Sequence, residues 1–200
     1  MLLEIIFATK NKGKMKEVRL LFEDTDIVPI SMEEAGIDIE VVEDGETFEE
    51  NAIKKAVEIC KVSGKIVLSD DSGLEIDFLN KGPGVHSARF LGVDTPYSQK
   101  NQIILEKLEG VPKEKRGARF VSVIAAAFPD GRVFTTKAAM EGIINDKAIG
   151  ENGFGYDPIF YYEGFKMTNA QMSLEQKNTI SHRGKALKLM KGRLLGELKI

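Results

Sequence analysis

Apolar and polar positions follow strand and helix spacings in turn along the first half of the chain. Leu2–Thr9 is a short apolar run that we interpret as a buried strand. After a polar, glycine-containing segment, apolar residues recur at helical spacing at Met15, Val18, Leu21 and Phe22. A strand, a polar turn and a helix in this order can present backbone N–H groups to an anion.

Thr47 and Glu50 form the T-x-x-E pattern of a capping box, which predicts that a helix begins there. The next buried strand, at Ile66–Leu68, is predicted to end at Asp70 and Asp71. Glycine and proline then predict a loop over residues 73–90. The apolar face of the capped helix comprises Phe48, Ala52, Ile53, Ala56, Val57 and Cys60.

The second half of the chain contains a predicted helix and a predicted β-hairpin. Thr95 is expected to cap a helix that has Pro96 in its first turn and ends near Gly110. Two β-prone runs, Arg119–Phe128 and Arg132–Ile144, flank a Pro-Asp-Gly turn. The remaining expected elements are a glycine-rich loop entering a short strand in ENGFGYDPIFY, a capping box at Ser173–Gln176 and a helix over Ala186–Leu198.

This order of helices and strands, with at least one antiparallel hairpin, indicates an α/β or α+β protein with a mixed sheet. The 200 residues fit one domain, 1–200, or two closely packed lobes. A net charge of -3 gives no general attraction to polyanions, so we expect no stable nucleic-acid partner. The single cysteine, Cys60, excludes an internal disulfide and lies in an apolar stretch, where we interpret it as core packing.

No apolar run approaches the roughly 20 residues that span a membrane. The lysines near the amino end follow the apolar run, the reverse of a secretory signal. We therefore expect a cytoplasmic protein with no membrane partner.

Phosphate-binding chemistry is concentrated in the turn FATKNKGK, which lacks the first glycine and the final hydroxyl of a P-loop. Hydroxyl, amide and ammonium donors there suit phosphate oxygens, and lysines at a helix N-terminus oppose the macrodipole unless an anion is present. The alternative is a solvated, lysine-rich first turn. The candidate substrate-binding residues are Thr9, Lys10, Asn11, Lys12, Gly13 and Lys14.

Two pairs of acids are candidate metal ligands. Glu43 and Asp44 precede the capped helix, and Asp70 and Asp71 follow a strand. Carboxylates without cysteine or a histidine pair favour magnesium, which takes one or two protein carboxylates together with substrate phosphates. The alternatives are a surface turn for the first pair and a turn or helix cap for SDDSG.

Two further segments are candidates for contacts with a nucleobase. Phe154 and Tyr156 lie in a glycine-flanked loop and can offer a stacking face, while Asp157 can accept from a base or ribose. His182 and Arg183 lie beside Gly184 at the start of the last helix, and arginine is a strong donor to a purine carbonyl. A hairpin loop with core aromatics and an ordinary helix start remain open as alternatives.

Five motifs in this order resemble the inosine/xanthosine triphosphate pyrophosphatase family, which acts on deaminated purine nucleotides. They cover most of the chain, and their combination is far more specific than any one of them. The matching stretches are Thr9-x-Asn11-x-x-Lys14, Asp70–Glu75, Pro83–Arg89, Gly153–Pro158 and Ser181–Ala186.

The resemblance implies a long mixed β-sheet with flanking helices, two lobes around a central cleft, a homodimer and Mg²⁺. It implies that a purine nucleoside triphosphate is hydrolysed to the monophosphate and pyrophosphate. The implied metal ligands are Glu43 and Asp71, and Asp71 is also the implied catalytic residue. The implied substrate contacts are the amino-terminal turn with Lys55 and Ser72, and a base pocket of Phe154, Gly155, Tyr156, Asp157, Lys177, His182 and Arg183.

Our hypothesis for the reaction is that water attacks the α-phosphorus, with Asp71 orienting a metal-bound water and Asp70 supporting it from outside the ligand set. Donors from Lys177, His182 or Arg183 would face the carbonyl at position 6 of the purine, where adenine carries an amino group. The rival functions are a pyrophosphatase for modified pyrimidine nucleotides and a non-catalytic nucleotide-binding module.

Overall fold

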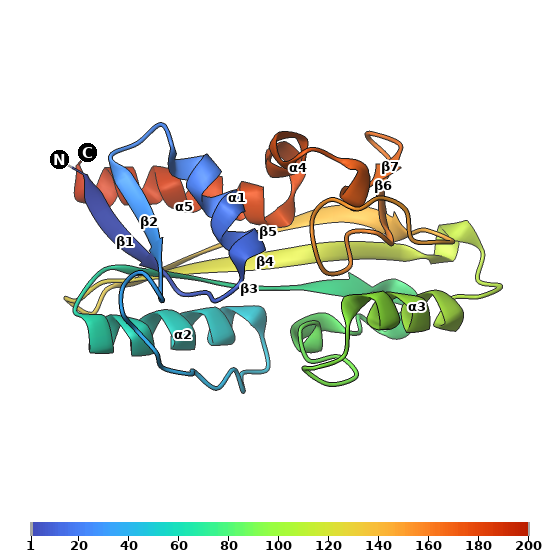
Figure 1. Cartoon of the computed structure of the whole chain (residues 1–200), viewed down its shortest axis with the longest axis horizontal. Coiled ribbons are helices and arrows are strands. Elements are labelled where there is room, and N and C mark those ends of the chain that lie inside the picture. Colours follow the sequence, from blue (N-terminus) through green and yellow to red (C-terminus); the bar gives the residue numbers. More distant parts are fainter. Residues whose placement is uncertain (1, 200) are drawn as a thin grey trace. The chain divides into compact units, whose positions relative to one another are not determined.

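The computed structural model describes residues 2–199 and has an α/β fold with one mixed sheet and flanking helices, as expected (Figure 1). The seven strands run in the order β2-β1-β3-β4-β5-β6-β7. The strands are β1 Leu3–Phe7, β2 Ile27–Ser31, β3 Val67–Ile76, β4 Gly117–Ala127, β5 Val133–Ile144, β6 Phe160–Tyr162 and β7 Met167–Thr168. The helices are α1 Lys12–Phe22, α2 Phe48–Ser63, α3 Tyr97–Lys107, α4 Leu174–Ile180 and α5 His182–Leu198.

The chain forms two compact units, each assembled from separate stretches of sequence. Unit 1 comprises Met1–Asp71, Ser122–Ala138 and His182–Ile200, and unit 2 comprises Ser72–Val121 and Ala139–Ser181. The boundary between the two falls inside β3, after Asp71, so the two predicted acids belong to unit 1. The prediction of a single domain over 1–200 stays a prediction.

Unit 1 is built on parallel strands, with β1 paired to β2 and to β3. The sequence pattern missed β2, which contains Pro29. Proline removes a donor from the strand ladder and is tolerated at the edge of a sheet, and β2 is an edge strand. The strand therefore forms because it pairs with β1, and the local sequence pattern does not predict it.

Helices cover both faces of the unit 1 strands, with α1 and α5 on one face and α2 on the other (Figure 1). The core beneath α1 and α5 contains Val18 and Phe22 of α1, Leu187 and Leu194 of α5, and Phe7 of β1. Helix α2 begins at the predicted capping box and ends at Gly64, which adopts a positive φ of 65°. These packed faces hold the amino-terminal turn and β3 in fixed positions.

Strand β3 is much longer than the apolar run Ile66–Leu68 predicted. It continues through Asp70 and Asp71 to Ile76, so the two acids lie within the strand and not at its end. The physical reason is that Leu74 and Ile76 alternate into the core of unit 2 and are fully buried, which keeps residues 73–76 extended in spite of Gly73. The loop predicted from residue 73 begins after the strand.

Unit 2 continues the sheet with antiparallel pairing of β5 with β6 and of β6 with β7. The predicted capping box of α4 is present, with Ser173 and Gln176 bonded reciprocally. The prediction that Thr95 caps α3 is wrong, because the Thr95 hydroxyl donates to the Leu91 carbonyl and the helix begins one residue later, after Pro96.

Within residues 2–199, no helix has the length and hydropathy that crossing a bilayer requires.

Leu187 and Leu189 form a matched pair on α5 for testing the unit 1 core. Leu187 is 0% exposed in the core cluster and Leu189 is 57% exposed. Leu187→Ala should lower the free energy of unfolding by about 2–5 kcal/mol, because it leaves a cavity. Leu189→Ala should change it by less than about 0.5 kcal/mol, both measured by urea denaturation. Equal losses in the two variants would contradict this packing.

Candidate active site

The amino-terminal turn of unit 1 is organised by the side chain of Asn11, which caps α1. Its Oδ1 accepts from the backbone N–H groups of Gly13 at 2.8 Å and Lys14 at 3.1 Å. The Thr9 hydroxyl in turn accepts from the Asn11 N–H at 3.1 Å. Two of the N–H groups expected to face an anion are therefore used by the cap, and anion binding at this turn would depend chiefly on side chains.

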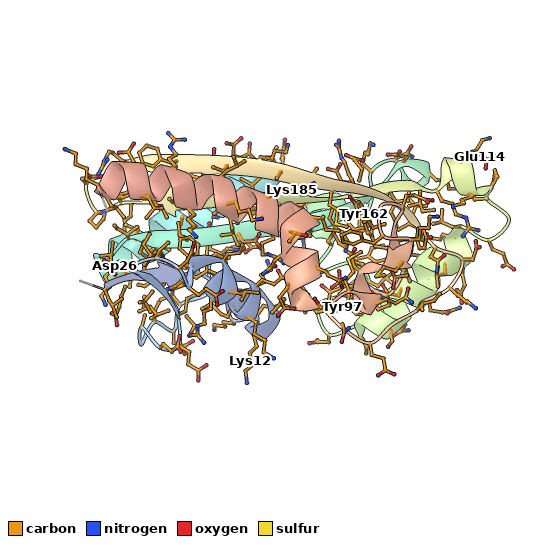
Figure 2. All side chains as sticks on the ribbon, turned by 90° about the horizontal axis from the view of Figure 1, so that it is seen from above. Lys12, Asp26, Tyr97, Glu114, Tyr162 and Lys185 are labelled. Atoms are coloured by element: carbon orange, nitrogen blue, oxygen red, sulfur yellow. The ribbon has the colours of Figure 1, made fainter. Side chains whose placement is uncertain are left out.

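The three lysines of the turn have different surroundings. Lys10 is exposed and forms an ion pair with Asp38 at 3.2 Å, and Lys12 is exposed and extends away from α1 (Figure 2). Lys14 is largely buried, with its ammonium 2.5 Å from the Asp70 carboxylate. Burial lowers the pKa of Lys14, and the charge of Asp70 opposes that shift. An ammonium has three donors, so this contact leaves Lys14 able to bind a phosphate oxygen as well.

Asp70 belongs to a buried ion network. Its carboxylate accepts from Lys14, from the Arg183 guanidinium at 3.3 Å and from the Ser122 hydroxyl at 2.7 Å. Arg183 also pairs with Glu17 of α1. The two cations hold the pKa of Asp70 well below its usual range, despite burial. Two acids and two bases thus neutralise one another inside unit 1.

The alternation of β3 explains why two adjacent acids are tolerated. Neighbouring strand residues point to opposite faces of a sheet. Ser69 donates to the Ala52 carbonyl of α2, so its face is the α2 face, and Asp71, two residues on, shares it. Asp70 points to the opposite face, where α1 and α5 supply Lys14 and Arg183. The two carboxylates therefore have separate surroundings.

Asp71 is only 7% exposed, and burial raises its pKa to about 6. The Glu43 carboxylate raises this pKa further, whereas Lys55, Lys14 and Asn51 lower it. A carboxyl group with a pKa near neutrality can accept a proton and release it again at physiological pH. Asp71 therefore has the surroundings of a general base.

Glu43 and Lys55 form an ion pair beside Asp71. The Lys55 side chain is largely buried and the Glu43 side chain is 30% exposed. Lys55 lies on α2, and Glu43 lies in the segment that precedes that helix. The structure thus brings a predicted phosphate ligand together with both predicted metal ligands.

Glu43 and Asp71 fit a magnesium ion that takes most of its remaining ligands from water and phosphate. Their electrostatic contact raises the pKa of Asp71, which is the mutual destabilisation that a cation would relieve. Among residues 2–199, no group of three or more His, Cys, Asp or Glu side chains could hold a metal ion. The donor set therefore suits a cation that arrives with a phosphate ligand better than a closed structural site.

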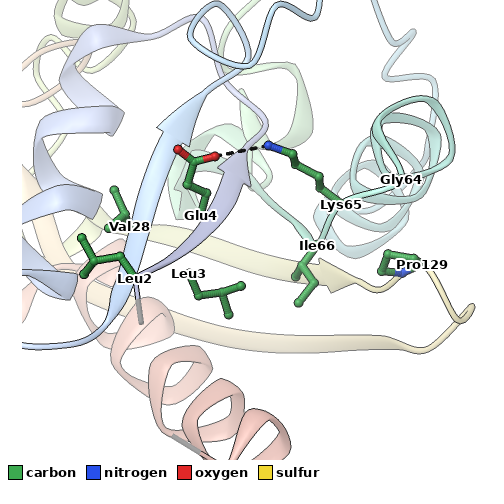
Figure 3. Close-up of a pocket in the computed structure, with 8 residues that line it drawn as sticks. All are labelled: Leu2, Leu3, Glu4, Val28, Gly64, Lys65, Ile66 and Pro129. Carbon is green, nitrogen blue, oxygen red and sulfur yellow. Dashed lines mark hydrogen bonds and ion pairs between the residues drawn. The ribbon is translucent and has the colours of Figure 1, made fainter.

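A pocket in unit 1 lies apart from these residues. It has a volume of about 590 Å³ and is bounded by β1, the end of α2 and the β4–β5 turn (Figure 3). Lys65 and Glu4 form an ion pair at 3.2 Å at its edge. None of the residues lining it was predicted as a site residue.

In unit 2, the predicted base-binding loop is rigidly held around Asp157. The Asp157 carboxylate accepts from the Phe154 N–H at 2.8 Å and from Asn169 at 3.3 Å, and it pairs with Lys177 at 2.7 Å. Gly153 has a φ of 74°, and a Cβ there would lie 2.2 Å from the Asp157 carboxylate. Both oxygens of Asp157 therefore hold the loop, and Gly153 permits their close approach.

The ammonium of Lys177 lies 4.6 Å from the centroid of the Phe154 ring, which is partly exposed. Tyr156 is buried, and its hydroxyl donates to the Ser87 carbonyl at 2.7 Å. Gly155 accepts at its carbonyl from Asn101 at 3.1 Å. Of the two aromatic residues in this loop, Phe154 is the more exposed, and Tyr156 supports the loop.

The other predicted site residues lie in both units. Ser72 is the first residue of unit 2 and lies in β3, partly exposed. His182 and Arg183 are buried in unit 1 at the start of α5, four residues earlier than the predicted helix start. Arg183, predicted as a donor to the base, has its terminal nitrogens bonded to Glu17 and Asp70. Its role toward the base stays a prediction.

A family comparison bears on this arrangement. Residues 5–193 match the model of the Ham1 family. The chain belongs to the Ham1 family. The resemblance to inosine/xanthosine triphosphate pyrophosphatases is confirmed, because Ham1 relatives carry the name dITP/XTP pyrophosphatase.

One such relative, from Desulforamulus reducens, is 48% identical over 186 residues, covering 93% of this chain and 92% of the relative. Solved Ham1 structures share the fold. The Ham1 protein of Staphylococcus aureus has a TM-score of 0.86 and 42% identity over 97% of this chain and 99% of its own. The HAM1 protein of Coxiella burnetii has a TM-score of 0.87 and 38% identity over 98% and 100%.

Sequence reasoning missed three residues of this Ham1 site, namely Glu17, Asn51 and Ser122. Glu17 follows Lys14 by three residues, a spacing that places both on one helix face. Asn51 precedes Lys55 by four residues, a spacing that likewise places both on one helix face. Ser122 interrupts the apolar run of residues 120–127 in β4, and a polar residue in such a run is the signal in the sequence.

Removing the charge of Asp71 should stabilise the metal-free protein. Its folded pKa of about 6 exceeds the ordinary value of 3.8, so stability falls as pH rises from about 4 to 6 and then stays level. Asp71→Asn should therefore raise the free energy of unfolding at pH 8 by on the order of 1–3 kcal/mol, with no gain at pH 3. Denaturation at both pH values measures this.

Asp130→Asn is the control for the Asp71 experiment. Asp130 is an exposed carboxylate whose pKa is lowered by hydrogen bonds from Arg132. Its contribution has the opposite sign, so this variant should not gain stability at pH 8. A loss of stability in Asp71→Asn at pH 8 would contradict the raised pKa.

Breaking the buried network should be strongly destabilising. Arg183→Met leaves Asp70 and Glu17 without their shared cation and should cost about 3–5 kcal/mol of unfolding free energy. Adding Glu17→Gln removes one of the two carboxylate charges that Arg183→Met leaves without their shared cation, so the double variant should be more stable than Arg183→Met alone. A loss below about 1 kcal/mol in the single variant, measured by urea denaturation, would show that the network is not buried in solution.

Proposed function

We propose that this chain is a nucleoside triphosphate pyrophosphatase that converts dITP, ITP and XTP to the monophosphate and pyrophosphate. The observation that carries the proposal is Asp71, a buried carboxyl group with a pKa of about 6 beside Glu43 and Lys55. A binding module would have no need of a raised carboxyl pKa, which weakens a buried acid as a structural ion-pair partner. The names of the Ham1 relatives supply the substrate class.

We assign the proton transfer to Asp71. The ionised carboxylate accepts a proton from the attacking water as the oxygen of that water bonds to the α-phosphorus, and the bond to the pyrophosphate oxygen breaks. Lys14 and Lys55 then stabilise negative charge on the phosphates and the leaving group. Glu43 and Asp71 would hold Mg²⁺, which supplies charge neutralisation and a more acidic water.

Base recognition is assigned to the Phe154 loop. Stacking on Phe154 tolerates any base, so selectivity requires a donor aimed at the carbonyl of position 6. Lys177 is the candidate in unit 2, because its ammonium lies beside the Phe154 ring and is held there by Asp157. Adenine presents an amino group at that position and would leave a buried donor unpaired.

The proposal also includes a homodimer and a cytoplasmic location, with no stable nucleic-acid or membrane partner. Exposed apolar side chains in residues 78–97 of unit 2 support a self-association surface, with Val93 76% and Phe78 48% exposed. The negative net charge supports the absence of a nucleic-acid partner. Analytical ultracentrifugation measures the oligomeric state directly.

A substrate panel tests the function. Pyrophosphate release is measured from dITP, ITP, XTP, GTP, ATP and dUTP, with Mg²⁺ and with a chelator. We expect turnover of the deaminated purines well above that of ATP and GTP, and none without the cation. Asp71→Asn should lower kcat by about 10²–10⁴-fold, because the proton acceptor is lost.

Neighbouring acids in one segment provide the matched control. Glu43→Gln should lose activity, whereas Asp44→Asn should keep it, because Asp44 is exposed and pairs with Lys54. A preference for pyrimidine nucleotides would favour the rival enzyme, and binding of ITP without turnover would favour a nucleotide-binding module. Near-normal turnover by Asp71→Asn would refute the assignment of the base.

A further inference from the structure

Asn51 of α2 contacts the segment that carries Glu43 and acts on Asp71. The residue is 0% exposed, and its Oδ1 accepts from the Gly45 N–H at 2.8 Å. Its Nδ2 is a buried donor without a hydrogen-bond partner among the described residues, yet the side chain lowers the pKa of Asp71.

Gly45 is required for the close approach on the other side of Asn51. A Cβ at Gly45 would lie 2.8 Å from Asn51 Oδ1 and 2.8 Å from the Glu50 Cβ. Glu50 in turn accepts from the backbone N–H groups of Glu46 at 2.8 Å and Thr47 at 3.3 Å. Two side chains from the first turn of α2 therefore fasten residues 45–47 to the helix.

The spacing along α2 matches the spacing along this segment. Asn51 and Lys55 are four residues apart and share one helix face. Gly45 meets Asn51, and Glu43, two residues earlier, meets Lys55. The Gly45–Asn51 bond therefore sets where Glu43 lies along the helix, independently of the ion pair.

We propose that Asn51 is a positioning residue that fixes the carboxylate of Glu43 relative to that of Asp71 by holding the Glu43 segment with Oδ1. The expected effect on cation binding rests on the proposed function, in which both carboxylates are ligands of Mg²⁺. Residues behind metal ligands commonly change metal affinity or activity by about 10–100-fold when they are replaced. Replacing Asn51 should therefore change the metal affinity and kcat, and leave recognition of the nucleobase unchanged.

The test uses two variants that break the same bond from opposite sides. Asn51→Leu removes both hydrogen-bonding ends at similar size, and Gly45→Ala displaces Asn51 Oδ1. Mn²⁺ binding to the nucleotide-free full chain is measured by calorimetry. We expect about tenfold weaker Mn²⁺ binding and about 10–100-fold lower kcat in both variants, with KM for ITP changed less than about threefold.

Thr47→Ala is the control for a purely structural effect. It removes the side-chain cap of α2 and should lower Tm, while leaving Asn51, the Mn²⁺ affinity and kcat unchanged. If Asn51→Leu and Gly45→Ala lose only Tm, or lose Mn²⁺ affinity no more than Thr47→Ala does, the proposal is overturned.

Amide hydrogen exchange separates this proposal from the proposed function. The Gly45 amide should exchange slowly in the parent chain and in Thr47→Ala, and rapidly in Asn51→Leu. If the parent chain neither binds Mn²⁺ nor hydrolyses nucleotides, the proposed function fails, and the exchange result still decides whether Asn51 holds the segment. Rapid exchange of Gly45 in the parent chain would refute the positioning role.

Discussion

The ion pairs of Asp70 with Lys14 and Arg183 are the interaction on which the rest of unit 1 depends. They join β3 to α1 and to α5, three elements far apart in the sequence. A buried charge without a partner is strongly destabilising, so these helices must dock in the one arrangement that brings both cations to Asp70. The end of α1 that carries Lys14, and with it the Asn11 cap, is thereby placed beside the strand that carries Asp71.

The two adjacent acids show how one residue type serves two purposes within a strand. Asp70 and Asp71 point to opposite faces, and their pKa values are shifted in opposite directions. Cations hold the pKa of Asp70 low, while burial and Glu43 raise that of Asp71 to about 6. Pairs of titratable groups with diverging pKa values are a usual sign of divided acid–base roles. Here strand alternation gives the two carboxylates their separate surroundings.

Features decided by neighbouring residues were predictable from the sequence, and features decided by distant ones were not. The capping boxes at Thr47 and Ser173 and the Pro-Asp-Gly hairpin turn depend on a few consecutive residues and were predicted correctly. Strand β2 and the full length of β3 depend on partners elsewhere in the fold, and so does the pairing of Arg183 with Glu17 across 166 residues. The order of five motifs identified the family, because it samples the whole chain. It could not reveal that the Asp157 and Arg183 side chains hold their own surroundings in place.

Burial and charge balance together account for the raised pKa of Asp71 among the acids of this cluster. The cations are Lys14, Lys55 and Arg183, and the carboxylates are Glu17, Glu43, Asp70 and Asp71. Three positive charges balance three carboxylates, so the cluster is neutral only when the fourth is protonated. Asp71 is the member whose pKa burial raises to about 6, and the proton therefore falls to it. A bare triphosphate would add negative charge to a cluster that already lacks positive charge. A divalent cation entering with the nucleotide would offset part of that negative charge and, held beside Asp71, would favour ionised Asp71, which is the form that a general base requires.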